Sequence, residues 1–281
     1  MELNKICFMG STGFALESCK ALHNSLHSGI SMVFTKPDAP KGRGQKLVPT
    51  PLKEWALENS IPVIEPRNKE EVQKEVFNIN PDLIVIIAYG MILPKAITDN
   101  YFCINAHASL LPKFRGPSPV QSVLLAGEKI TGITIMKVNE KMDQGPILLQ
   151  EKIEIEDTDD YLSLSEKLSG LSAELLPKYI NTKLRSDRIA PVSQDHSEAT
   201  YCRKITKEDL FLDLSLDPEA IVNKVRAFSP FPGAYTMKDG KRVKILEAEV
   251  KDNILSIKKV KPEGKGLMDY NDYLLAHPSL I

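Results

Sequence analysis

The stretch Leu83-Ile84-Val85-Ile86-Ile87-Ala88 is apolar without interruption. A strand with one solvated face alternates apolar and polar side chains, whereas a strand covered on both faces carries apolar side chains throughout. We therefore predict that residues 83–88 form a central strand of a sheet that helices cover on both sides.

Other β-rich runs alternate with helical patterns along the first two thirds of the chain. Further strands are predicted at residues 5–9, 31–35, 103–107 and 131–138. Helices are predicted at residues 14–28, 52–59, 70–79, 118–127 and about 160–185. Pro177 lies inside the last of these, so that segment is either one kinked helix or two. This alternation is typical of α/β folds, and we expect a Rossmann-like, doubly wound, mostly parallel sheet.

The chain has 281 residues, more than the ~250 at which a single core usually stops growing, so we expect two domains. Residues 190–206 are polar and have little periodicity, as expected of a linker between domains. The expected organisation is a large α/β domain at 1–189, a linker at 190–206, and a small β domain at 207–281 with a helix at 217–227 and strands at 242–250 and 254–260.

Charge and cysteine usage limit the class of protein. The formal net charge is -1, so any contact with nucleic acid must come from local basic patches. The four cysteines are far apart, and no CxxC pair favours a zinc site or a disulfide framework. We find no apolar run of ~18 residues and no signal-peptide pattern, and therefore expect a cytoplasmic protein without a membrane partner.

Asn105 and His107 lie at the end of the strand predicted at 103–107, and the segment Ser109-Leu110-Leu111-Pro112 follows them. In open α/β sheets, ligands bind beyond the carboxyl ends of the strands. An amide can donate a hydrogen bond to a developing oxyanion, and a histidine can move a proton near neutral pH. This pair indicates acyl transfer, although a lone histidine is more often a core residue bonded to a backbone carbonyl.

Asp143 lies in a turn that follows the strand predicted at 131–138. An aspartate in a tight turn usually bonds its own backbone. If this turn faces His107 instead, the Asp143 carboxylate would orient the imidazole. Spacing along the chain leaves both readings open.

Asn105, His107, the 109–112 segment and Asp143 together resemble the folate-dependent formyltransferase superfamily. The resemblance implies that Asn105, His107 and Asp143 are catalytic and that no metal is required. It also implies a folate pocket formed by Ser109, Leu110, Leu111 and Pro112 and by the strand end at Ala88, Tyr89 and Gly90. Lys113 and Gln144 stand where the family commonly has arginine and threonine, but neither change removes a reacting group.

Two further segments point to the branch of the superfamily that acts on methionyl-tRNA. The loop at 34–51 carries Lys36, Lys41, Arg43 and Lys46, with Gly42 and Gly44 on either side of the arginine. It is similar to the long loop that this branch inserts against the tRNA acceptor stem, so these four basic residues are expected to bind tRNA. Segments 226–234 and 261–265 resemble parts of the branch's OB-like carboxyl domain, which is expected to be shortened here.

The resemblance implies a monomeric enzyme that moves a formyl group from 10-formyltetrahydrofolate to the α-amino group of the initiator methionyl-tRNA. Such transfer supports translation initiation and needs no covalent enzyme intermediate. Two alternatives stay open from the sequence. One is an amino-sugar formyltransferase, which shares the catalytic set and carries a partly similar loop. The other is an RNA- or folate-binding module without activity, which the intact Asn105, His107 and Asp143 disfavour.

Overall fold

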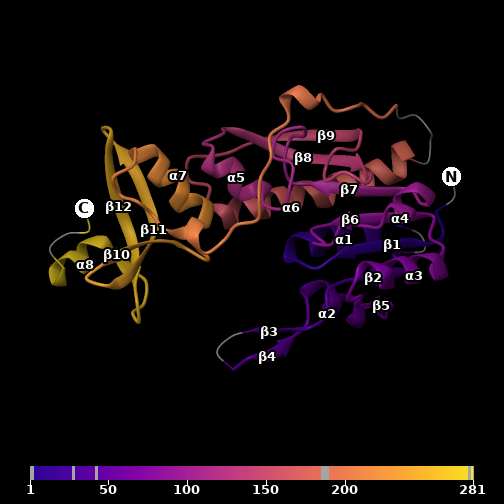
Figure 1. Ribbon diagram of the computed structural model, residues 1–281, viewed down its shortest axis with the longest axis horizontal. Helices are drawn as coiled ribbons and strands as arrows, with labels where there is room; N and C mark the ends of the chain where they lie inside the picture. The colour runs from indigo at the N-terminus through magenta and orange to yellow at the C-terminus, as the bar shows by residue number, and fades with distance from the viewer. Residues whose placement is uncertain (1–2, 27–28, 42–43, 185–189, 278–279, 281) are drawn as a thin grey trace. The chain divides into compact units, whose positions relative to one another are not determined.

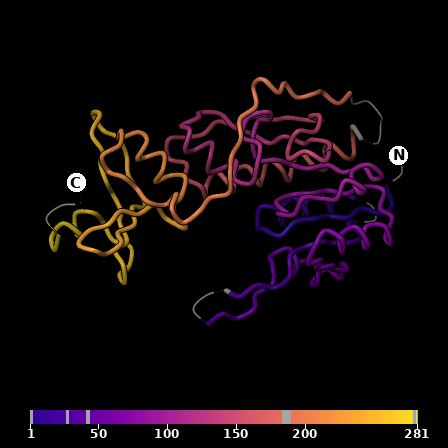
Figure 2. The backbone as a smooth tube through the Cα atoms, viewed as in Figure 1, coloured from indigo at the N-terminus to yellow at the C-terminus, as the bar shows by residue number. Residues whose placement is uncertain are grey.

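The computed structural model describes residues 3–26, 29–41, 44–184, 190–277 and 280 (Figure 1 and Figure 2). It forms two compact units, each assembled from several stretches of the chain. Unit one consists of residues 1–117, 132–152 and 166–201, and unit two of residues 118–131, 153–165 and 202–281. The expected domain boundary at 189 and the helix ends expected at 28 and 185 lie outside the described residues.

A seven-stranded sheet forms the centre of unit one (Figure 1). Its strands are, in spatial order, β5 (Val63–Ile64), β2 (Met32–Phe34), β1 (Ile6–Gly10), β6 (Leu83–Ile87), β7 (Cys103–His107), β8 (Ile130–Lys137) and β9 (Ile147–Glu154). The β5–β2, β2–β1, β1–β6 and β6–β7 pairs are parallel, whereas β7 and β8 are antiparallel. The predicted mostly parallel sheet, with the apolar strand β6 in its middle, is thus confirmed.

Side-chain caps explain where three of the helices of unit one begin. These are α1 (Gly13–Ser25), α2 (Pro51–Glu58), α3 (Lys69–Ile79), α4 (Lys95–Asn100) and most of α6 (Tyr161–Lys178). Thr12, Thr50 and Asn68 accept hydrogen bonds from free backbone N–H groups at the starts of α1, α2 and α3. Pro177 lies within α6 without ending it, and a π-type helical segment, Tyr179–Leu184, follows.

The four cysteines of the chain are buried. Cys7 and Cys103 pack with Phe34 and Ile84 in the core of unit one. Burial penalises the charged thiolate and raises the pKa of both Cys7 and Cys103 to about 12. These thiols therefore behave as apolar packing groups.

The basic loop after β2 contains an antiparallel hairpin that the sequence pattern did not predict. Strand β3 (Ala39–Lys41) pairs with β4 (Lys46–Val48), so that Lys41 faces Lys46 in the register. Gln45 adopts a left-handed backbone conformation, with φ of 48°. Two of the residues singled out in the sequence, Gly42 and Arg43, lie outside the described part of the chain.

Unit two contains a four-stranded antiparallel sheet, consistent with a small OB-like domain. Its strands are β10 (Ala234–Lys238), β11 (Lys241–Lys251), β12 (Ile254–Pro262) and β13 (Met268–Asp269). The unit also holds α5 (Pro119–Leu125), α7 (Pro218–Phe228) and α8 (Tyr270–Ala276). The predicted strands at 242–250 and 254–260 are confirmed as β11 and β12.

The connection between β11 and β12 is short because Asp252 and Asn253 both take positive φ values, 52° and 60°. Two such residues form the tight turn whose twist matches a hairpin. Apolar residues of α7 and the sheet, including Val225, Phe228 and Ile245, fill the core of this unit. Across the described residues of both units, no helix is long and apolar enough to cross a bilayer.

Candidate active site

Strand β7 places Asn105 and His107 at the carboxyl edge of the sheet in unit one. Asn105 pairs with Ile86 of β6 and with Met136 of β8, so it is held in the sheet from both sides. His107 closes the strand and is 6% exposed. Because alternate residues of a strand point to the same face, the amide and the imidazole project together.

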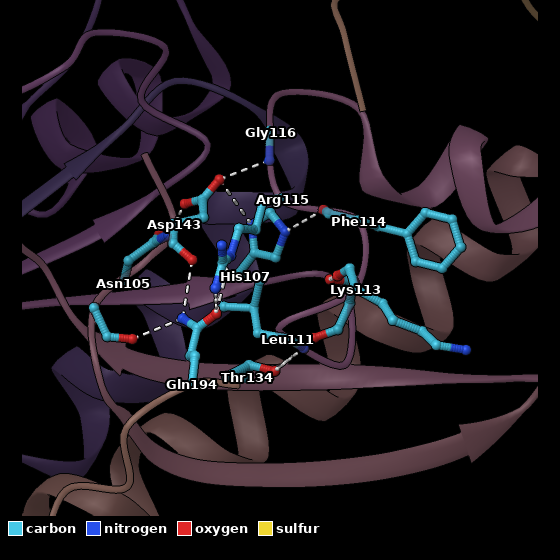
Figure 3. A network of polar contacts seen from close by, with 12 residues as sticks. Asn105, His107, Leu111, Lys113, Phe114, Arg115, Gly116, Thr134, Asp143 and Gln194 are labelled. Carbon is cyan, nitrogen blue, oxygen red and sulfur yellow. Dashed lines mark hydrogen bonds and ion pairs between the residues drawn. The ribbon is translucent and has the colours of Figure 1, made fainter. Parts of the chain in front are cut away.

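The turn that carries Asp143 meets this pair (Figure 3). Asp143 Oδ2 lies 3.8 Å from His107 Nδ1. Asn105 Nδ2 donates to Asp143 Oδ1 at 3.5 Å, and the backbone N–H of Gly116 donates to Asp143 Oδ2 at 2.8 Å. The structure therefore brings together the three residues that the sequence singled out for catalysis.

The hydrogen bond at His107 Nε2 decides which ring nitrogen is available for proton transfer. Nε2 lies 2.9 Å from the carbonyl oxygen of Phe114, and a carbonyl can only accept, so Nε2 donates. Nδ1 is then the nitrogen that can gain or lose a proton, and it faces the Asp143 carboxylate.

The segment 109–112 is held by hydrogen bonds within unit one. Ser109 Oγ donates to the carbonyl of Lys113 at 2.7 Å. Thr134 Oγ1 donates to the carbonyl of Ser109 at 2.6 Å and accepts from the N–H of Leu111 at 3.1 Å. The Leu111–Pro112 peptide bond is cis. These hydrogen bonds hold the loop in one conformation, and the Ser109 hydroxyl bonds within the loop.

The strand end at 88–90 presents backbone rather than side chains. Ala88 and Gly90 are exposed and take positive φ values, 46° and 76°, whereas Tyr89 packs into the core with 2% exposure. A Cβ added at Gly90 would lie 2.6 Å from Lys36 Nζ, so the lysine ammonium occupies the space above the glycine. Burial raises the pKa of the Tyr89 hydroxyl to about 12.

The basic residues expected to bind tRNA are placed differently from one another. Lys36 is the second residue after β2 and lies beside Gly90, whereas Lys46 is exposed on the β3–β4 hairpin. The backbone of Lys41 belongs to the same hairpin, but its side chain, like all of Arg43, lies outside the described residues. Of the basic residues of this loop, Lys36 therefore lies just beyond the end of the β2 strand, whereas Lys41 and Lys46 belong to the hairpin.

Three residues in contact with the site were not found from the sequence. Arg115 is almost fully buried and binds Gln194, and Gln194 in turn donates to the Asp143 turn. Thr200 Oγ1 accepts from the N–H of Phe114 at 2.8 Å. Gln194 and Thr200 belong to the polar segment interpreted as a linker. Nothing in the sequence pattern indicated that Arg115 and Gln194 are partners.

A polar cleft of about 480 Å³ lies beside this turn. Gln144, Pro146 and His196 line it, together with residues of α4 and of the segment after β8. The turn that carries Asp143 also lines the cleft, through Gln144 and Pro146. Asn105 and His107 do not line the cleft. A ligand in the cleft would therefore contact the turn and His196 rather than His107.

Comparison with known proteins identifies the family. Residues 4–180 match the family described as formyl transferase, and residues 204–254 match the formyl transferase C-terminal domain. A methionyl-tRNA formyltransferase of Kosmotoga olearia is 45% identical over 253 residues, which cover 89% of this chain and 81% of that protein.

Two solved structures show the same fold. A methionyl-tRNA formyltransferase from Clostridium thermocellum aligns with a TM-score of 0.61 at 21% identity, over 94% of this chain and 100% of that one. An N-formyltransferase from Helicobacter canadensis, solved with folinic acid and dTDP-3-aminofucose, aligns with a TM-score of 0.69 at 18% identity over 89% of each chain. From the sequence matches, the chain belongs to the methionyl-tRNA formyltransferase family.

Proposed function

We propose that this chain, as a member of that family, transfers a formyl group from 10-formyltetrahydrofolate to the α-amino group of the initiator methionyl-tRNA. The observation that carries the proposal is the cluster of Asn105, His107 and Asp143 at the end of β7, in a chain 45% identical to a methionyl-tRNA formyltransferase. The product would be the formylated methionyl-tRNA used to start translation.

In the proposed reaction, the α-amino nitrogen of methionine attacks the formyl carbon and forms a bond to it. The bond between the formyl carbon and N10 of the folate then breaks. The oxygen of the tetrahedral intermediate carries negative charge and needs hydrogen-bond donors. The Asn105 amide has two N–H groups, and Asp143 Oδ1 lies 3.5 Å from its nitrogen. The other N–H is the donor that we assign to the oxyanion.

Proton movement completes the balance, because the attacking amine must lose a proton and the departing N10 must gain one. We assign this transfer to His107 through Nδ1, since Nε2 already donates to Phe114. Asp143 lies beside Nδ1 and stabilises the protonated ring while the proton is in transit. Such acid–base assistance typically accelerates a reaction by roughly 10²–10⁴-fold.

For the folate, we propose a pocket between the exposed backbone at 88–90 and the 109–112 loop. The strands that end at these two segments, β6 and β7, are neighbours in the sheet. Pre-formed loops of this kind suit a flat aromatic ligand, because backbone groups can bond its edge while apolar side chains cover its face. All the proposed reacting groups belong to a single chain, so we propose a monomer as the acting unit.

For the tRNA, two basic surfaces support the proposal. The first is the β3–β4 hairpin with Lys46. The second is a face of the sheet in unit two, where Lys244 of β11 lies directly opposite Lys261 of β12. Like charges opposite each other destabilise a sheet, so this pairing favours a role in binding an anion such as phosphate.

Aromatic rings accompany the charges on this second surface. The Arg242 guanidinium lies 4.7 Å from the centre of the Tyr235 ring, and Lys244 Nζ lies 6.0 Å from that of Phe231. Burial, with Lys261 and Arg242 nearby, lowers the pKa of Lys244. Basic side chains beside aromatic rings suit single-stranded RNA, whose bases can stack while its phosphates pair with cations.

The proposal is tested by measuring formyl transfer from 10-formyltetrahydrofolate to purified methionyl-tRNA. An amino-sugar nucleotide serves as the competing acceptor in a parallel reaction. Transfer to the tRNA with none to the sugar is the expected result. Transfer to the sugar alone would replace the proposed acceptor, and absence of transfer to either would favour a binding module.

A further inference from the structure

Arg115 is the largest fully buried side chain of the protein among the described residues, with 1% exposure. Its Nε and Nη2 atoms donate to Gln194 Oε1 at 3.0 and 2.7 Å. Nη1 donates to the hydroxyl of Tyr201 at 3.0 Å, and Nη2 also donates to His196 Nδ1 at 3.0 Å. A fork of this kind holds its acceptor in one position and one orientation.

The fork fixes which way the Gln194 amide points. Because both guanidinium nitrogens donate, only the amide oxygen can face Arg115, and the NH₂ group must point away. Nε2 then donates to the carbonyl of Asp143 at 2.9 Å and to the carbonyl of Gly145 at 2.7 Å (Figure 3). Gln194 is 6% exposed, so these bonds are shielded from water.

The Asp143–Gly145 turn depends on such outside contacts. Asp143 has φ of 53°, a conformation that a non-glycine residue keeps only where its surroundings impose it. Gly145 packs so closely on β8 that an added Cβ would lie 1.7 Å from the carbonyl oxygen of Lys137. The turn is therefore held by β8 on one side and by the two Gln194 donors.

We propose that Gln194 is a positioning residue for Asp143 and that Arg115 sets the direction in which Gln194 donates. The inference rests on the proposed function, because it assumes that Asp143 acts on His107. In this arrangement, Gln194 determines where the Asp143 carboxylate lies, and the carboxylate determines how His107 Nδ1 exchanges its proton. The contact links residues far apart in the chain through the buried side chains of Arg115 and Gln194.

Gln194→Glu tests the two halves of this arrangement separately. The substituted side chain has the same shape and can still accept from Arg115, now as a buried ion pair, but it cannot donate to the carbonyls of Asp143 and Gly145. We expect the melting temperature to fall by a few degrees, because two carbonyl groups lose their donor. We expect kcat to fall roughly 10- to 100-fold, because misplacement by 1 Å can reduce a rate by 10²-fold. KM for folate and tRNA should change less than about threefold.

A structural readout accompanies the kinetics. Gly116 N–H donates to Asp143 Oδ2 at 2.8 Å, so amide hydrogen exchange at Gly116 and across 143–145 should become faster in Gln194→Glu. Tyr201→Phe is the matched control, because it removes an acceptor from Arg115 and a long contact from Gln144 of the turn but leaves both Gln194 donors in place. This control should keep kcat within about twofold of the wild type.

Two results would overturn the inference. One is a kcat for Gln194→Glu within about twofold of the wild type. The other is a loss of kcat in which exchange rises throughout unit one rather than at the turn, since that would show a general structural role. If Gln194→Glu does not fold, Arg115→Lys, which loses the fork but keeps the charge, must show the same selective loss of kcat and faster exchange at the turn.

The wild type is assayed first with methionyl-tRNA. Failure of that reaction counts against the proposed function, whereas the exchange comparison still decides whether Gln194 holds the turn. The two proposals can therefore fail independently.

Discussion

The loop after β7 and the hairpin after β2 both follow strands of one sheet, yet their side chains are treated in opposite ways. After β7, His107, Ser109 and the backbone of Leu111 all have partners within unit one. On the hairpin, Lys46 is exposed and Leu47 is 68% exposed. The first loop is organised before any substrate arrives, as chemistry requires, whereas the second presents side chains that a partner could order on binding.

The largest effect should come from removing the proton-transfer groups of the β7 loop. His107→Ala, and Asp143→Asn as the change that keeps the shape, should each lower kcat by roughly 10²–10⁴-fold. Single-turnover formylation of methionyl-tRNA measures the loss, with folate binding measured alongside. Near-wild-type turnover in either variant would exclude that residue from the mechanism. It would also count against the view that the loop after β7 carries the chemistry and the hairpin does not.

Asn105→Ala should have the next largest effect. Loss of one oxyanion donor typically removes about 2.7–4 kcal/mol of transition-state stabilisation, which corresponds to roughly 10²–10³-fold in kcat. The comparison of kcat with the dissociation constant of the folate is the decisive measurement. If only the dissociation constant changes, Asn105 would be a binding residue.

Thr134→Val tests whether the loop after β7 contributes more to the free energy of unfolding than the hairpin does. The hydroxyl bonds the Ser109 carbonyl and the Leu111 N–H in a buried site, so its loss should destabilise the protein by about 1–3 kcal/mol. Urea unfolding measures this change in the free energy of unfolding. Lys46→Ala on the hairpin is the control, for which we expect a change within about 0.5 kcal/mol. Equal effects at the two positions would contradict the difference in organisation.

The smallest effect is expected for Lys46→Ala in tRNA use. Loss of one phosphate contact should weaken tRNA binding several-fold and make the dependence of log K on log salt shallower by about 1. Binding is measured over a salt series, and turnover at saturating tRNA should be unchanged. An identical salt slope in variant and wild type would leave this lysine as ordinary solvated surface.

The sequence predicted those parts of the fold that leave a periodic or continuous pattern. Residues 83–88 show an apolar strand directly, and the structure places β6 at the centre of the sheet. The β3–β4 hairpin was missed because its strands contain proline and flank glycines, which usually indicate an irregular loop. Strand β9 was also missed, since it carries charged residues towards its end, Glu151, Lys152 and Glu154.

The site was predictable only as far as its reactive groups could be recognised from the sequence. Asn105, His107 and Asp143 were proposed from chemistry and resemblance, and the structure brings them together. Gln194 could not be found in that way, because a buried glutamine that bonds two carbonyls leaves no local signal in the sequence. Its segment is polar and aperiodic, which is also how a linker looks.

The burial of all four cysteines has a practical consequence. Thiolates, not thiols, react with maleimides, and a thiol whose pKa is raised by burial is inert at neutral pH. A cysteine introduced at an exposed hairpin position, such as Leu47→Cys, would therefore react with a maleimide faster than Cys7 or Cys103. A fluorophore there would report, in real time, when an RNA approaches the hairpin and when it leaves.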